Sequence, residues 1–276
     1  MQNGKVNYCF FFIFCCLNHT FSQPMVIAHR GASAVCVENS LSAFEKAIRS
    51  GVDYIETDVH QTSDSVVVIM HDFSVNRTCI VPGDLRKKYG NKTAIKEISS
   101  VEFSRLTYKE ANETPPTLDS AIKLINGRCR LLIELKKGSD YYPGIEKRII
   151  AIIKRNHAEE WVNVIHSFDK KALLEVNRQS TGMKLQKLIV FRFPLTSFNF
   201  SKKINKDKFE DWQGVNVYYR FITKRLIRKL HKQHKTVYAW TVNKKGPARR
   251  LIKKGVDGII SNKPGMIKAL IRNNNL

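Results

Sequence analysis

Short apolar runs alternate with helix-patterned segments through most of this 276-residue chain, and no other feature restricts its fold as strongly. In the first unit, apolar residues recur at helical spacing from Leu41 to Ile48, between two apolar runs. A strand, a helix and a further strand in this order form a parallel pair. Eight strands of this kind predict an α/β fold, the (β/α)8 TIM barrel, in which functional side chains gather at the C-terminal strand ends. We expect the strands at Met25–Ala28, Tyr54–Val59, Leu131–Leu135, Val162–Ile165, Leu185–Phe191, Gly214–Tyr219, Thr236–Val242 and Gly258–Ile260.

The alternation stops in a long segment, residues 73–116, that follows a short apolar run at Val66–Met70. Turn-forming residues such as Pro82-Gly83 interrupt this segment. A stretch of this length without regular elements is uncommon in a compact domain unless it has a function, such as covering a site. We therefore expect a barrel domain at residues 23–276, with an insertion at 73–116 after the second strand.

The first 22 residues have the pattern of a targeting segment. Lys5 is followed by ten uncharged residues, Tyr8–Leu17, which are rich in Phe and Cys. This run is too short to cross a bilayer easily, but it matches the apolar core of a signal peptide. We expect residues 1–22 to be a cleaved signal peptide and the protein to be secreted or periplasmic. An uncleaved membrane anchor is the alternative.

Basic residues dominate the charge, with 47 Lys and Arg against 24 Asp and Glu, which gives +23 at pH 7. A surface of this kind favours anionic partners such as phosphates, lipid head groups or nucleic acids. The sequence contains no compact nucleic-acid-binding motif, and its basic residues are spread along the chain. We expect no nucleic-acid partner and at most a weak contact with an anionic membrane surface. The oligomeric state is not predicted.

Three cysteines remain after removal of the targeting segment: Cys36, Cys79 and Cys129. An odd number excludes a fully paired disulfide scaffold. Cys36 and Cys79 lie in predicted loops and could pair in an oxidising compartment. Cys129 precedes a strand, so we expect it to be a buried thiol.

Acidic residues occur within two of the predicted strands. Glu56 and Asp58 are two positions apart, so their side chains point to the same face, about 7 Å from each other. Like charges on a central strand are costly to bury unless a cation neutralises them. Glu134, on another strand, adds a third carboxylate, and three carboxylates fit a hard cation such as Ca²⁺ or Mg²⁺. The alternative for Glu134 is a structural ion pair with Lys136, two residues later.

Histidines stand at the ends of two apolar runs. His29 follows the first run and His71 follows the run before the insertion. Imidazole changes charge near neutral pH, as acid–base catalysis requires, and two histidines beside paired carboxylates indicate a catalytic site. His60 and His166 lie close to the same site in sequence and are second candidates. With Arg30 beside His29, the set is typical of a metal-assisted phosphodiesterase.

An ordered set of short motifs resembles the glycerophosphodiester phosphodiesterase family. Each motif is weak alone, but their order along essentially the whole mature chain is specific. The motifs are His29-Arg30-Gly31, Glu38-Asn39-Ser40, Glu56-x-Asp58, His71-Asp72, Asn76-Arg77-Thr78, Pro116-Thr117-Leu118, Glu134-Leu135-Lys136, Ser167-Phe168 and Val256-Asp257-Gly258-Ile259-Ile260.

The resemblance implies a (β/α)8 barrel with a small inserted region after the second strand. It also implies an enzyme that hydrolyses glycerophosphodiesters, which are small-molecule substrates, to sn-glycerol 3-phosphate and an alcohol through a cyclic phosphate. A divalent metal, Ca²⁺ or Mg²⁺, would be held by Glu56, Asp58 and Glu134. His29 and His71 would be the general acid and base.

The resemblance assigns the remaining site residues to substrate binding. Arg30 and Lys136 would contact the phosphate. Phe168 and Trp240 would form an apolar wall against the glycerol or its alcohol, and simple barrel packing is their alternative. The last loop departs from the family pattern, because Ser261-Asn262-x-Pro264 replaces a more usual Thr-Asp-x-Pro.

Two other functions fit the same residues. A phospholipase D-type enzyme acting on lysophospholipids or sphingomyelin would share the paired-histidine barrel, although the sequence shows no exposed apolar helix for lipid insertion. A non-catalytic barrel that binds phosphate esters is the third possibility, and the complete histidine and carboxylate sets argue against it.

Overall fold

The computed structural model describes residues 23–179, 182–190 and 212–273. Eight parallel strands form a closed barrel, because the first strand pairs with both the second and the last. The predicted (β/α)8 barrel is therefore confirmed. The barrel strands are β1 (Met25–His29), β2 (Tyr54–Gln61), β6 (Arg130–Leu135), β7 (Val164–Ser167), β8 (Lys184–Ile189), β9 (Gly214–Tyr218), β10 (Thr236–Trp240) and β11 (Gly258–Ser261).

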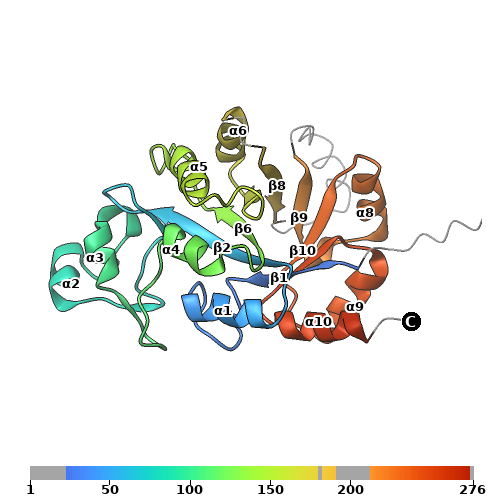
Figure 1. Cartoon of the computed structure of the whole chain (residues 1–276), viewed down its shortest axis with the longest axis horizontal. Helices are drawn as coiled ribbons and strands as arrows, with labels where there is room; N and C mark the ends of the chain where they lie inside the picture. The colour runs from blue at the N-terminus through green and yellow to red at the C-terminus, as the bar shows by residue number, and fades with distance from the viewer. Residues whose placement is uncertain (1–22, 180–181, 191–211, 274–276) are drawn as a thin grey trace, which may run out of the picture.

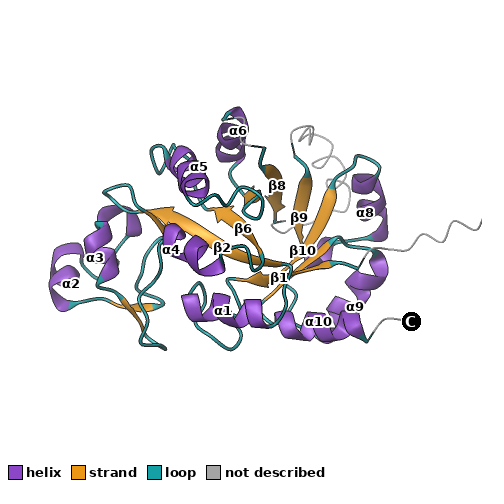
Figure 2. Ribbon diagram, in the orientation of Figure 1, coloured by secondary structure: helices purple, strands orange, loops and turns teal. Residues whose placement is uncertain are grey.

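Helices surround this sheet (Figures 1 and 2). Their apolar faces pack on the outward side chains of the strands, as Phe44, Ile122 and Ile149 do with Ile55 and Ile133 in one large buried cluster. Polar side chains accept hydrogen bonds at helix starts: Ser40 and Thr117 cap the first two barrel helices. The helices are α1 (Leu41–Arg49), α4 (Leu118–Ile125), α5 (Ile145–Arg155), α6 (Lys170–Arg178), α8 (Lys224–His231), α9 (Lys245–Lys254) and α10 (Pro264–Arg272).

The segment between β2 and α4 forms a small unit at one end of the molecule (Figure 1). It begins with β3 (Val67–Ile69), which pairs antiparallel with β2. Most of its buried apolar residues form a hydrophobic cluster separate from the barrel core, whereas Val67 and Ile69 of β3 belong to the barrel core. The unit also contains β4 (Cys79–Ile80), α2 (Gly83–Tyr89), the 3₁₀ turn η1 (Ile95–Glu97), α3 (Ser100–Ser104) and β5 (Thr107–Tyr108).

The inner face of the barrel changes from apolar to polar along its axis. Tyr54, Leu132 and Val164 form a buried cluster with inward side chains of other strands. Two residues further along each strand, on the same face, stand Glu56, Glu134 and His166. The C-terminal end of the barrel therefore contains buried polar groups that its packing does not require.

Several sequence expectations have a direct outcome here. Cys36, Cys79 and Cys129 are all free thiols, so the pairing considered for Cys36 and Cys79 does not occur, and Cys129 is buried as expected. No helix in the described part of the chain is long and apolar enough to cross a membrane. The signal peptide predicted at residues 1–22, and Phe191 at the end of the predicted fifth strand, lie outside the described residues.

Candidate active site

The three carboxylates predicted as metal ligands lie together at the C-terminal end of the barrel. Glu56 and Asp58 project from β2, and the strand register pairs Asp58 with Glu134 on the neighbouring β6. All three residues are buried, with exposed fractions of 1%, 0% and 7%. The register also places His29 beside Glu56 and His166 beside Glu134.

Two cationic side chains balance the negative charge of Asp58. Nζ of Lys136 lies 2.9 Å from Oδ1 of Asp58 and 2.7 Å from Oε1 of Glu134, and Nε of Arg30 lies 3.3 Å from Oδ2 of Asp58. The side-chain amide of Asn39 donates to the same carboxylate oxygen. Burial opposes ionisation of Asp58, but Lys136 and Arg30 outweigh it and hold its pKa well below the usual range. The ion pair considered as the alternative for Glu134 and Lys136 is thus present, and Asp58 shares it.

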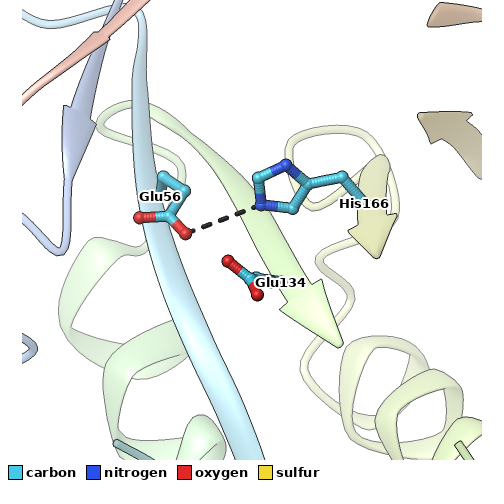
Figure 3. A group of neighbouring side chains, drawn as sticks. All are labelled: Glu56, Glu134 and His166. Carbon is cyan, nitrogen blue, oxygen red and sulfur yellow. Dashed lines mark ion pairs between the residues drawn. The ribbon is translucent and has the colours of Figure 1, made fainter. Parts of the chain in front are cut away.

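Glu56, Glu134 and His166 form a group that could hold a metal ion (Figure 3). Each residue offers one ligand atom, and these atoms all lie within 4.8 Å of one another. Nε2 of His166 is 3.5 Å from Oε1 of Glu56, and neither atom has a hydrogen-bond partner among the residues that the structure describes. The group shares Glu56 and Glu134 with the predicted ligand set, and includes His166 where the prediction has Asp58.

The charges around this group are not balanced. Among the described residues, three buried carboxylates face the two fixed cations Arg30 and Lys136. Burial raises the pKa of Glu134, against the opposing attraction of the Lys136 ammonium. An added divalent cation would supply the missing positive charge and a partner for the unpaired oxygen of Glu56, so these residues fit one.

Both predicted catalytic histidines have an acceptor at Nδ1. Nδ1 of His29 donates to Oδ1 of Asn262 at 2.6 Å, and Nδ1 of His71 donates to Oδ1 of Asp72 at 2.6 Å. In each ring Nε2 is then the nitrogen available to a substrate. Burial lowers the pKa of His29, which favours its neutral form.

A chain of ion pairs connects His71 to the carboxylates. Asp72 binds Arg77, Arg77 binds Glu38, and Glu38 accepts from Arg30 at 3.1 Å. Arg77 belongs to the segment between β3 and α2, so this network ties the inserted unit to the barrel mouth.

Aromatic side chains form one wall of the mouth. Phe168, after β7, meets Trp240 at the end of β10 edge to face, with ring centroids 5.7 Å apart, and Trp240 meets Tyr218 at 5.8 Å. Phe168 is 44% exposed, which argues against the alternative that it only fills the core. Tyr218 could not be predicted as part of this wall, because an aromatic residue at a strand end is also common in a core.

The two second-candidate histidines have different positions. Nδ1 of His60 is hydrogen-bonded to the hydroxyl of Tyr142, and Nε2 is hydrogen-bonded to the backbone carbonyl of His71. Both ring nitrogens therefore have partners, and the ring holds the backbone at His71 in place. His166 lies in the carboxylate group. Three asparagines that hold site residues, Asn39, Asn216 and Asn262, were not predicted as site residues.

Several known proteins are similar to this chain in sequence and fold. The model of the glycerophosphoryl diester phosphodiesterase family matches residues 29–266. A glycerophosphodiester phosphodiesterase of Caldanaerobacter subterraneus subsp. tengcongensis is 32% identical, over 91% of this chain and 98% of its own length. A lysophospholipase D of Rattus norvegicus is 24% identical, over 90% of this chain and 86% of its own. The fold is similar to that of an Oleispira antarctica phosphodiesterase solved with the product sn-glycerol-3-phosphate, with a TM-score of 0.72, 24% identity, and coverage of 91% and 97%.

Proposed function

Because this chain belongs to the glycerophosphoryl diester phosphodiesterase family, we propose that it hydrolyses glycerophosphodiesters to sn-glycerol 3-phosphate and an alcohol with the help of a divalent cation. The observation that supports this most directly is the buried excess of negative charge at Glu56, Asp58 and Glu134, beside two histidines whose Nε2 atoms are available. These three carboxylates would hold the cation. When bound, Ca²⁺ or Mg²⁺ would neutralise them and stabilise negative charge on the phosphate oxygens.

His29 is suited to act as the first base. Its lowered pKa keeps the ring neutral, and its hydrogen bond to Asn262 leaves the Nε2 lone pair free. Nε2 would take the proton of the glycerol 2-hydroxyl while that oxygen attacks phosphorus. The new P–O bond closes a five-membered cyclic phosphate, and the bond to the alcohol oxygen breaks.

His71 is suited to act as the first acid. The Asp72 carboxylate compensates the charge of the ring when Nε2 also carries a proton. That proton would pass to the departing alcohol oxygen. In the second half, His71 would take a proton from water as it attacks phosphorus, and His29 would return its proton to the 2-oxygen as the ring opens.

Arg30 and Lys136 would attract the phosphate. Both already lie at the carboxylate cluster, so their charges can also face the non-bridging oxygens, whose negative charge increases in the transition state. Phe168 and Trp240 would exclude water on one side of the glycerol or the alcohol.

A second candidate is the phospholipase D-type reaction on lysophospholipids or sphingomyelin. The lysophospholipase D relative supports it. A weak contact with anionic membranes would suit either activity. Between Ile222 and Val256 the chain has twelve Lys and Arg and no Asp or Glu, and most of these basic residues are exposed on α8 and α9. A secreted or periplasmic location would follow from the predicted signal peptide.

A substrate panel tests the proposal. Purified protein should release sn-glycerol 3-phosphate from glycerophosphocholine, and EDTA should abolish the release. Choline release confined to lysophosphatidylcholine or sphingomyelin vesicles would favour the second candidate. Tight binding of phosphate esters without turnover of any diester would leave a non-catalytic barrel.

A further inference from the structure

We propose that His166 is a ligand of the bound cation, and that the site therefore prefers a transition-metal ion such as Mn²⁺, Co²⁺ or Zn²⁺ to Ca²⁺ and Mg²⁺. The inference rests on the proposed function only in that Glu56 and Glu134 must hold a cation. It changes the expected chemical class of that cation, because a site of carboxylates alone would favour a hard ion.

The position of His166 supports direct coordination. Its side chain is 2% exposed, and Nε2 faces Oε1 of Glu56. In the described part of the chain neither of these two atoms has a hydrogen-bond partner. A buried polar atom without a partner is costly, and here two such atoms face each other across 3.5 Å. Two ligands about 2.1 Å from one ion lie roughly 3.0–3.5 Å apart at tetrahedral or octahedral angles. The group of three, which spans at most 4.8 Å, needs little contraction to reach this geometry.

A simple hydrogen bond between His166 and Glu56 explains the arrangement less well. The 3.5 Å separation exceeds the usual range for an N–H···O bond. Oε1 of Glu56 is held by no other described group. The second oxygen of this carboxylate, Oε2, accepts the backbone N–H of Arg30 at 3.0 Å. The spacing is what a small ion between the two atoms would produce.

Asn216 controls which nitrogen of His166 carries the proton. Its amide nitrogen lies 2.7 Å from Nδ1 of His166, while its amide oxygen has no hydrogen-bond partner within residues 23–179, 182–190 and 212–273. A half-turn of this amide places the oxygen against Nδ1, which then donates, and Nε2 presents its lone pair to the ion. Histidines that bind metals usually donate the other ring N–H to an oxygen acceptor in this way. Asn216 is therefore a positioning residue for the ligand.

An imidazole ligand selects among cations. Ca²⁺ and Mg²⁺ take oxygen ligands almost entirely, whereas Mn²⁺, Co²⁺ and Zn²⁺ accept mixed carboxylate and imidazole sets. One imidazole, His166, added to the carboxylates of Glu56, Asp58 and Glu134 forms a set of the second kind.

Spectroscopy of the wild-type protein gives the direct test. With Mn²⁺ bound, pulsed electron paramagnetic resonance should show nitrogen hyperfine coupling from a coordinated imidazole, and His166→Gln should remove it. Calorimetry should show a loss of Mn²⁺ and Zn²⁺ affinity of about 10- to 100-fold or more in His166→Gln, with Ca²⁺ affinity changed by less than about threefold. Asn216→Asp, which favours the required tautomer, should strengthen Mn²⁺ binding.

The outcomes separate this inference from the proposed function. Mn²⁺ binding and EDTA-sensitive turnover without nitrogen coupling in the wild type would overturn the role of His166 and leave the reaction intact. Equal loss of Mn²⁺ and Ca²⁺ affinity in His166→Gln would overturn the selectivity. Failure of the wild type to bind any divalent cation would overturn both.

Discussion

Nδ1 of His29 on β1 lies 2.6 Å from Oδ1 of Asn262, although 233 positions separate the two residues. Barrel closure brings them together, because β1 pairs with β11 and places Ala28 beside Ser261. The backbone N–H of Asn262 donates to Oδ1 of Asn243, which holds the last loop in place. The tautomer of the proposed base is therefore set by the far end of the chain.

Replacing Asn262 by Asp should change the pH dependence of catalysis. In the wild type, burial lowers the pKa of His29 below its ordinary value of 6.5. The base is therefore mainly neutral at pH 6.5, and kcat/KM falls only at lower pH. A carboxylate at position 262 would stabilise the imidazolium and raise this pKa. We expect the acid limb of kcat/KM to move up by about one pH unit. Asn262→Ala is the control, because it should lower kcat/KM without moving the limb upward, and an unchanged limb in Asn262→Asp would argue against His29 as the base.

The loss of rate on replacing His71 by Ala should depend on the leaving group of the substrate. An alcohol such as choline needs a proton to depart, so its release should slow by about 10²- to 10⁴-fold. The p-nitrophenyl ester of glycerol 3-phosphate has a leaving group that departs unprotonated, so the release of p-nitrophenolate in the first turnover should fall much less. His29→Ala should slow both substrates alike. Equal losses for both substrates in His71→Ala would contradict the assignment of His71 as the acid, and calorimetric melting checks that each variant is folded.

The barrel could be predicted from the sequence because each strand carries local evidence of its own. Runs such as Leu131–Leu135 are apolar over a strand's length, and Glu56 and Asp58 share a face by strand periodicity alone. Pairings between distant elements could not be predicted in this way. Asn216 lies within β9 and Asn262 directly follows β11, and only the strand register brings each one to a ring nitrogen.

Only one of the two ion pairs of Lys136 could be predicted from the sequence. Sequence spacing indicates a pair with Glu134, two residues away on the same face. The second pair, with Asp58, depends on the register between β2 and β6, which a single sequence does not specify.

Replacing Lys136 by Met should destabilise the metal-free protein, and a divalent cation should reverse much of the effect. Loss of the ammonium leaves Asp58 and Glu134 buried without their shared partner, at a cost of about 3–5 kcal/mol in the free energy of unfolding. Saturating Mn²⁺ or Ca²⁺ would restore positive charge and recover about 2–3 kcal/mol at a hundredfold excess over Kd. Chemical denaturation with and without cation measures this. The exposed neighbour Lys137, changed to Met, is the matched control. Equal stability of Lys136→Met and wild type without cation would show that the pair contributes little.

Replacing Phe168 by Ala should affect substrate binding more than stability. The side chain is 44% exposed and contacts Trp240 at the edge of the mouth, so its loss removes apolar contact with the substrate and leaves the core intact. We expect KM for glycerophosphocholine to rise about 3- to 10-fold, with a smaller change in kcat. A large fall in the thermal midpoint with an unchanged KM would instead indicate a packing role. Steady-state kinetics combined with a melting curve distinguishes the two.

Reversing charge on the basic face of α8 should weaken binding to anionic membranes. Arg225 and Arg228 of α8 and Lys232, which directly follows the helix, are exposed at the end of the molecule away from α2 (Figure 1). Each basic residue near an anionic surface contributes about 1 kcal/mol, and salt screens the attraction. Changing all three to Glu should therefore lower sedimentation with phosphatidylserine vesicles at least tenfold at low salt, with little effect at high salt. The control changes three exposed basic residues of the inserted unit, Arg86, Lys87 and Lys92, to Glu, which alters the net charge equally. An equal loss of binding in both variants would attribute it to net charge alone, and retention on nucleic acid but not on vesicles would identify a different partner.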